Sequence, residues 1–377
     1  MTGLDLPLVD GHCHVVVDRQ PDRQAFELFL TEATQPAPTG VSYADSQLGL
    51  ALRRWCAPPL GLPPGAPLEE YLVRRTELPA ADVRRRLLEA AGLSHLLVDT
   101  GLGATGSVSL PQLASAARAE VRPVVRLERV AEDLASSGVS AEDFADAYAA
   151  TLVDATRDAV AVKSILAYRH GFAVPATRPG MAEVRDAARG WLANNGRHRA
   201  AEAIRQWRLD DPVLLRFVLW CGLDRGLPVQ LHTGFGDRDL RLTSVNPALL
   251  QGLFEAAEPT GTPIVLLHCY PYHREAGWLA AVHPYVYVDV GLTVAHAGIR
   301  AEAILGEFCE LAPFRKLLYS SDAYGLPELY LVGAAQFREA FGRLLDSWRR
   351  QGALTLADAD RIGAMVGADN ARRLYSL

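Results

Sequence analysis

The first apolar run of the chain is Leu8–His14, which reads Leu-Val-Asp-Gly-His-Cys-His. Side chains on a strand alternate between its two faces, so His12 and His14 point the same way and Cys13 packs on the other side. Two imidazoles on one side of a strand end are half of a divalent-metal site. An ordinary surface or hydrogen-bonded pair of histidines explains the same pattern. The choice between these interpretations therefore depends on what the rest of the chain places beside them.

Short apolar, β-branched runs recur along the chain, with helical patterns between them. Such near-continuous runs are typical of strands that are buried on both faces. Strands that alternate with helices predict βαβ units, and eight of them predict a (β/α)8 TIM barrel rather than an open sheet. The predicted strands are Pro7–Asp10, Ser94–Thr100, Arg122–Leu127, Ala161–Ala167, Pro228–Thr233, Pro263–Cys269, Val286–Val290 and Lys316–Asp322. The predicted helices include Ala81–Ala91, Ala141–Arg157, Pro212–Arg225, Pro247–Ala257 and Ala301–Glu310.

We expect residues 1–377 to form a single barrel domain, because no linker or repeat divides the chain. Two connections are too long for plain loops between a strand and a helix. Residues 15–80 follow the first predicted strand and residues 169–211 follow the fourth. Both begin at the carboxyl ends of strands, where barrels bind substrates, so we expect them to cap the active-site mouth.

Composition narrows the functional class. Of the 377 residues, 49% are hydrophobic and 22% are charged; 38 Lys and Arg against 44 Asp and Glu give a net charge of −6. This mixed surface predicts neither a nucleic-acid partner nor a membrane, and leaves a homo-oligomer possible. Five scattered cysteines without a Cys-x-x-Cys pair, and no leader-like segment after Met1, predict a cytoplasmic protein.

Four polar residues lie within or directly after later predicted strands. His232 ends the fifth, His268 the sixth and Asp322 the eighth, and Lys163 lies in the fourth. A parallel barrel brings these strand ends to one rim, so residues far apart in sequence converge. A single histidine there is more often structural than a ligand, and a single aspartate is often a helix cap. The joint pattern with His12 and His14 nevertheless predicts a metal centre.

The residue types favour zinc over magnesium or calcium, which prefer shells made of oxygen. Such an ion lowers the pKa of bound water toward about 7, which suits hydrolysis at neutral pH. Asp322 is placed to accept the proton of the water and to pass it to the leaving group. His268 either binds a second metal ion or polarises the substrate carbonyl. We therefore predict catalytic roles for Asp322 and His268.

The motif Asp10–His14 resembles the first-strand signature of the amidohydrolase superfamily, and His232, His268 and Asp322 match its later strand ends in order. Residues 320–328 (SSDAYGLPE) and 163–169 (KSILAYR) resemble its amidohydrolase 2 branch, including the amidohydrolase-like domains fused to glutamine synthetase-like domains. The resemblance implies a metal-dependent hydrolase on a (β/α)8 barrel. It is weakest in residues 15–80 and 169–211, which we expect to select the substrate.

Lys163 has two interpretations. In binuclear members of the superfamily a fourth-strand lysine is carbamylated and bridges two metal ions. On that pattern Lys163 completes a ligand set with the histidines and Asp322, and the protein binds two ions. Many members of the amidohydrolase 2 branch are mononuclear, however, and an unmodified Lys163 then contacts a substrate carboxylate.

Further polar residues follow the fourth and sixth strands and are candidates for substrate binding. Tyr168, Arg169 and His170 come after Lys163, and His273 comes after His268. Arg169 suits an anionic group through paired hydrogen bonds. The sequence thus predicts hydrolysis of an amide, a cyclic amide or an ester in a small carboxylated metabolite. The alternatives are a metal-dependent decarboxylase on the same barrel and a catalytically silent binding barrel.

Overall fold

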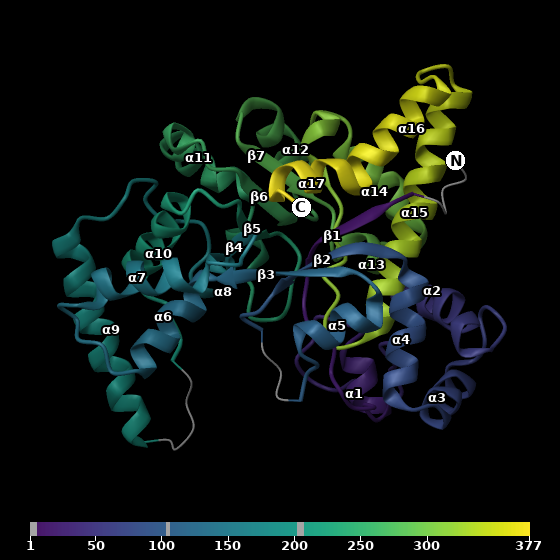
Figure 1. The fold of residues 1–377 in the computed structure, drawn as a ribbon, viewed down its shortest axis with the longest axis horizontal. Helices are drawn as coiled ribbons and strands as arrows, with labels where there is room; N and C mark the ends of the chain where they lie inside the picture. Colours follow the sequence, from purple (N-terminus) through teal and green to yellow (C-terminus); the bar gives the residue numbers. More distant parts are fainter. Residues whose placement is uncertain (1–5, 103–105, 202–206) are drawn as a thin grey trace.

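Eight strands run parallel and are hydrogen-bonded in sequence order (Figure 1). The computed structural model describes residues 6–102, 106–201 and 207–377. Backbone hydrogen bonds close the sheet, because Gly11 N donates to Tyr319 O and Asp322 N donates to His12 O, each at 3.0 Å. The predicted (β/α)8 barrel is confirmed. The strands are β1 (Leu8–Cys13), β2 (Leu93–Asp99), β3 (Glu120–Arg126), β4 (Ala161–Ser164), β5 (Val229–Thr233), β6 (Ile264–His268), β7 (Val286–Asp289) and β8 (Leu317–Leu318).

Helices surround the barrel and fill its connections. The α-helices are α1 (Arg23–Leu28), α2 (Gln47–Cys56), α3 (Leu68–Glu77), α4 (Ala80–Ala91), α5 (Leu110–Ala117), α6 (Leu127–Ser136), α7 (Phe144–Ala155), α8 (Leu166–Arg169), α9 (Met181–Ala201), α10 (Pro212–Asp224), α11 (Gln251–Ala257), α12 (His273–Val282), α13 (Thr293–Ala297), α14 (Ala301–Phe308), α15 (Pro327–Arg350), α16 (Leu356–Ala364) and α17 (Asn370–Tyr375). The shorter helices are η2 (Pro58–Leu60), η3 (Leu242–Ser244), η4 (Pro247–Leu250), η5 (Glu258–Thr260), η6 (Gly298–Arg300), η7 (Phe314–Lys316) and the π-helix η8 (Met365–Asp369).

Successive residues of a strand face opposite sides of the barrel wall, and the buried apolar residues form two separate clusters, one outside the wall and one inside it. On β5, Val229 and Leu231 pack outward against the helices, which leaves Gln230 and His232 facing the barrel interior. The interior cluster takes residues from six strands together with the C-terminal segment. Its buried members are Val9, Leu97, Val124, Val160, Ala161, Val265, Leu267, Leu318, Ala368, Ala371 and Tyr375. The barrel is thus filled at the end opposite the predicted site, as barrels of this kind are.

Two predicted strands are shorter than expected. The fourth strand ends at Ser164 instead of Ala167, because Glu128 Oε1 accepts hydrogen bonds from Ser164 Oγ at 2.6 Å and from Ile165 N at 2.9 Å. Ser164 Oγ in turn accepts from Leu166 N, so the chain turns directly into α8. The eighth strand comprises Leu317–Leu318 alone, and the segment up to Asp322 instead follows β1 through single backbone hydrogen bonds.

The two long connections lie on different sides of the barrel (Figure 1). Residues 15–80 carry α1, α2 and α3, and α2 packs against α15. Residues 169–211 carry the long helix α9, which packs on α7 and α10, with Trp191 against Phe144. Among the described residues, no helix has both the length and the apolarity needed to cross a membrane.

Candidate metal centre

His12 and His14 leave β1 on the same side, and each is held by one ring nitrogen. His12 Nδ1 lies 2.9 Å from Gln230 Oε1, and His14 Nδ1 lies 3.4 Å from the backbone oxygen of Asp99. A carbonyl oxygen accepts hydrogen bonds only, so Nδ1 carries the proton in both rings. Nε2 of each ring therefore presents a lone pair to the centre of the site. Burial lowers the pKa of His12 to about 3, which keeps this imidazole neutral at pH 7.

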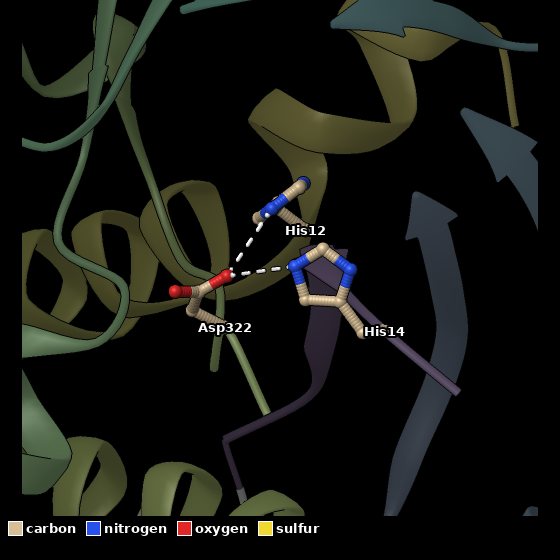
Figure 2. Close-up of side chains that lie close together, drawn as sticks. All are labelled: His12, His14 and Asp322. Atoms are coloured by element: carbon tan, nitrogen blue, oxygen red, sulfur yellow. Dashed lines mark ion pairs between the residues drawn. The ribbon is translucent and has the colours of Figure 1, made fainter. Parts of the chain in front are cut away.

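Asp322 faces these two nitrogen atoms from the segment after β8 (Figure 2). Its Oδ1 lies 3.2 Å from His12 Nε2 and 3.4 Å from His14 Nε2. Its backbone has a φ of 51°, a left-handed conformation that is uncommon outside glycine and that turns the carboxylate toward β1. Burial alone raises the pKa of Asp322, but His268, His12 and His14 outweigh burial and hold this pKa well below its usual value.

Two buried carboxylates hold the segment that carries Asp322 in place. Asp10 accepts hydrogen bonds from Ser321 N at 2.8 Å and from Ser321 Oγ at 2.5 Å, which ties the end of the eighth strand to β1. Asp289, at the end of β7, holds the preceding residue by accepting from Ser320 Oγ at 2.9 Å. Burial raises the pKa of Asp10 and of Asp289 to about 7. These hydrogen bonds explain why Asp322, outside any regular strand, still reaches the histidines.

His268 and His232 extend the site toward β5 and β6. His268 Nε2 lies 3.7 Å from Asp322 Oδ2, and the rings of His268 and His232 are 4.6 Å apart between centroids. A φ of 68° turns His268 inward although its neighbour Leu267 already faces the interior. Burial lowers the pKa of His268 to about 4 and that of His232 well below its ordinary value. Both imidazoles are therefore neutral at pH 7.

Lys163 completes the set from β4. Its Nζ lies 2.7 Å from His12 Nε2 and 3.9 Å from Asp99 Oδ2. Burial lowers the pKa of Lys163, while Asp99 and Asp322 oppose that change. Asp99 also accepts from Arg126 Nε at 3.1 Å and from Nη2 at 2.6 Å. The six predicted metal-site residues thus form one connected group.

The polar atoms of this group are arranged to bind a cation rather than to hydrogen-bond with one another. His12 Nε2, His14 Nε2 and Asp322 Oδ1 offer three lone-pair donors, and the ligand atoms of these residues lie within 4.8 Å of one another. His232 Nε2 and His268 Nε2 are buried and have no hydrogen-bond partner among the residues that the structure describes. Buried polar atoms left in this way are costly unless a ligand satisfies them. Imidazole and carboxylate together suit zinc or a similar divalent ion.

A cavity of about 480 Å³ opens above this group. His14, Lys163, His232 and Asp322 line its floor. Leu28 and residues 31–34, at the end of α1 and just after it, line one wall, so the first long connection contributes directly to the mouth. The second connection contributes Arg169 and Arg208 at its two ends, whereas α9 packs on the outer helices.

The four predicted substrate-binding residues separate into two pairs. Tyr168 and Arg169 line the cavity; Tyr168 packs on the His232 ring, and Arg169 Nη2 lies 2.8 Å from Glu132 Oε1. His170 is exposed and lies outside the cavity lining. His273 is buried on α12 and lies 2.5 Å from Glu307 Oε2, also away from the cavity. The structure thus brings Tyr168 and Arg169 to the site, but not His170 or His273.

Gln230, Asp99 and Arg126 also belong to the site and were not predicted. Asp99 and Arg126 end β2 and β3, so the rule that singled out Asp322, a polar residue after an apolar run, applies equally to them. Gln230 precedes His232 by two residues and therefore shares its face of β5. Strand alternation alone was a sufficient signal for Gln230.

Comparison with known proteins agrees with this geometry. A family model described as amidohydrolase matches residues 9–377. The chain belongs to the amidohydrolase family. It is an enzyme of the amidohydrolase type, and the family suggests a divalent metal ion as its cofactor.

Relatives of this amidohydrolase include a fungal protein and solved barrel structures. It is 34% identical over 258 residues to protein fluG of Emericella nidulans, which is 65% of this chain but 29% of that protein. A protein named as a metal-dependent hydrolase, from Lactobacillus casei ATCC 334, has a similar structure: 27% identity, a TM-score of 0.82, and coverage of 99% of this chain and 96% of that one. Uronate isomerase from Thermotoga maritima, at 15% identity and a TM-score of 0.61 over 99% and 95% of the chains, shares the fold.

Proposed function

We propose that this amidohydrolase is a zinc-dependent hydrolase that cleaves an amide, a cyclic amide or an ester in a small carboxylated metabolite. The observation that carries the proposal is the convergence of His12, His14 and Asp322 on one point at the floor of a cavity. His232 and His268, with unpartnered buried nitrogen atoms beside that point, are the further candidate ligands. Five unpaired cysteines suit a reducing compartment, and we place the protein in the cytoplasm.

The residues of the chain divide the reaction between them. A divalent ion held by the histidines supplies Lewis acidity and an activated water molecule. Asp322 accepts the proton of the attacking water and passes it to the leaving nitrogen or oxygen. Its low pKa keeps it ionised at neutral pH and ready to act as the base. His268 lies beside Oδ2 of the same carboxylate, and we assign to it the polarisation of the substrate carbonyl.

Lys163 determines which of two forms the centre takes. A carbamylated Lys163 adds a carboxylate-like group and suits two metal ions, whereas an unmodified amine suits one. The lowered pKa of Lys163 favours the neutral amine that carbon dioxide modifies. Intact-protein mass spectrometry for a carbon dioxide adduct, together with the metal content, distinguishes the two forms.

The carboxylated substrate is supported by arginine side chains in the cavity. Arg126 uses Nε and Nη2 on Asp99, and Arg169 uses Nη2 on Glu132. A guanidinium group has five N–H donors, so each arginine retains others for a ligand. Arg208 lines the same cavity near Arg169. A substrate carboxylate at this wall leaves the bond to be cleaved above the histidines.

The test is turnover of a panel of carboxylated amides, cyclic amides and esters in ¹⁸O-labelled water. We expect ¹⁸O in the product acid, loss of activity on chelation and recovery on addition of zinc. Carbon dioxide release without ¹⁸O incorporation would instead identify a decarboxylase. A folded protein that neither carries nor takes up a divalent ion would identify a catalytically silent barrel.

A further inference from the structure

Gln230 links the two ends of the barrel interior through the amide of its side chain. It is fully buried on β5, and its amide contacts three groups, two on β1 and one on α17. Nε2 donates to Gly11 O at 2.7 Å and to Tyr375 Oη at 3.0 Å, while Oε1 lies 2.9 Å from His12 Nδ1. A buried amide with all of its partners in place is rigid and specific.

One partner fixes the orientation of the Gln230 amide, because it can act only as a hydrogen-bond acceptor. Gly11 O is a backbone carbonyl and accepts hydrogen bonds only, so the NH₂ group of Gln230 must face it. The carbonyl oxygen of Gln230 therefore faces His12 Nδ1, which must carry the proton. His12 Nε2 is left with its lone pair on the side of Lys163 Nζ, at 2.7 Å, and of Asp322 Oδ1, at 3.2 Å.

Tyr375 holds the other side of the amide. It lies on α17, and its ring is buried in the interior cluster at the end of the barrel opposite the site. A Cβ atom on Gly11 would crowd Tyr319 O at 3.1 Å but would make only an ordinary contact with the Tyr375 ring at 3.8 Å. A single chain of hydrogen bonds thus runs from the C-terminal helix through Gln230 to His12.

We propose that Gln230 is a positioning residue that locks His12 in the Nδ1–H tautomer required of a metal ligand, and that Tyr375 holds the amide in place. The C-terminal helix thereby sets the affinity of the metal centre from the far end of the barrel. The effect on affinity rests on the proposed function. The effect on the tautomer does not, because it concerns the protein without metal.

Zinc affinity is the first readout, measured by competition with a chromophoric chelator and zinc alone as the probe. Gln230→Leu is expected to bind zinc 10- to 100-fold more weakly, the usual cost of removing a group that orients a ligand. Tyr375→Phe, which loses one hydroxyl, is expected to bind it several-fold more weakly. Gln230→Glu is expected to stay near wild type, because a protonated carboxyl group keeps the acceptor that faces His12 and one of the two donors, and the Tyr375 hydroxyl can donate to it in place of the second.

The matched control is Gln336→Leu. Gln336 is another buried glutamine, and its Nε2 donates to Gly298 O at 2.9 Å, on α15 and away from the site. Its substitution removes a buried amide of the same kind without touching His12. We expect wild-type zinc affinity in this variant. Equal zinc affinities in Gln230→Leu and Gln336→Leu would overturn the proposal.

The ring nitrogens of His12 provide the second readout, by ¹⁵N–¹H correlation in the metal-free protein. We expect the Nδ1–H form in the wild type and in Gln230→Glu, and a mixture with the Nε2–H form in Gln230→Leu. An Nε2–H form in the wild type would overturn the proposal, even if Gln230→Leu failed to fold. Absence of zinc binding in the wild type would instead contradict the proposed function, and the tautomer would still decide the role of Gln230.

Discussion

The barrel interior has a lower layer and an upper layer, and β1, β5 and β6 contribute to both. The lower layer is apolar, and its polar atoms, such as the Gln230 amide, have hydrogen-bond partners. The upper layer is polar, and among the described residues three of its buried histidine nitrogens have no such partner. The lower layer consists of Val9, Leu97, Val124, Gln230, Val265, Leu267, Leu318 and Tyr375. The upper layer consists of His12, His14, Lys163, His232, His268 and Asp322.

The contrast teaches where the protein gains stability and where it gains function. Apolar packing, with every buried polar atom hydrogen-bonded, lowers the free energy of the folded state. Buried polar atoms without a partner raise it until a ligand binds. On β6, Leu267 belongs to the first case and the adjacent His268 to the second. Substitutions in the two layers should therefore have opposite consequences for activity and for stability.

The largest expected effect is on turnover, in Asp322→Asn. The amide cannot accept the proton of the attacking water, so kcat is expected to fall by about 10²- to 10⁴-fold. The variant should remain folded, because Asp322 contributes no apolar packing. Steady-state kinetics with circular dichroism as the control test this, and near-normal turnover would remove Asp322 as the proton shuttle.

The second effect is on stability, in Leu267→Ala. Truncation of this buried side chain is expected to lower the free energy of unfolding by about 2–5 kcal/mol. Metal content should stay at the wild-type value, because no ligand is removed. Chemical denaturation and metal analysis of the same sample make the comparison. Lost metal with unchanged stability would contradict the separation of the two layers.

The third effect is on the pH dependence of stability, and the His268→Asn variant isolates the contribution of His268 to it. In the folded, metal-free protein its pKa is about 4, whereas the ordinary value is 6.5. The unfolded chain therefore binds a proton that the folded chain does not, and stability falls as pH drops from 6.5 toward 4. Over this pH range, the free energy of unfolding of the wild type should fall by up to about 3 kcal/mol more than that of His268→Asn. A difference that is flat with pH would show that His268 is not buried as a neutral ring.

The smallest effect is on substrate binding at the cavity wall. Arg169→Gln removes one guanidinium group, so KM for a carboxylated substrate is expected to rise about tenfold with little change in kcat. The uncharged analogue of that substrate is the control and should be unaffected. Equal changes for both substrates would indicate that Arg169 only supports the wall through Glu132.

Strand alternation and strand order were enough to predict much of this molecule. They placed His12, His14, His232, His268 and Asp322 at one rim, because a parallel barrel leaves few other arrangements. They did not predict that β4 ends at Ser164, because Glu128, far from it in sequence, bonds the strand end.

The residues missed in the site have a related cause. Tyr375 reaches Gln230 from the C-terminal helix, a contact that no local pattern reveals, whereas strand alternation was a sufficient signal for Gln230 itself. His170 and His273 were predicted from sequence proximity to strand ends, but the backbone turns into α8 and α12 and directs them elsewhere. Proximity in sequence is thus a weaker guide than the face of the strand.

Metal content tests the central claim most directly. The protein is purified without chelator and measured by mass spectrometry for divalent ions, before and after incubation with zinc. We predict one or two equivalents in the wild type and none in the His12→Asn/His14→Asn double variant, with both proteins folded. A folded wild type that binds no divalent ion under either condition would contradict the claim that the upper layer is a metal centre.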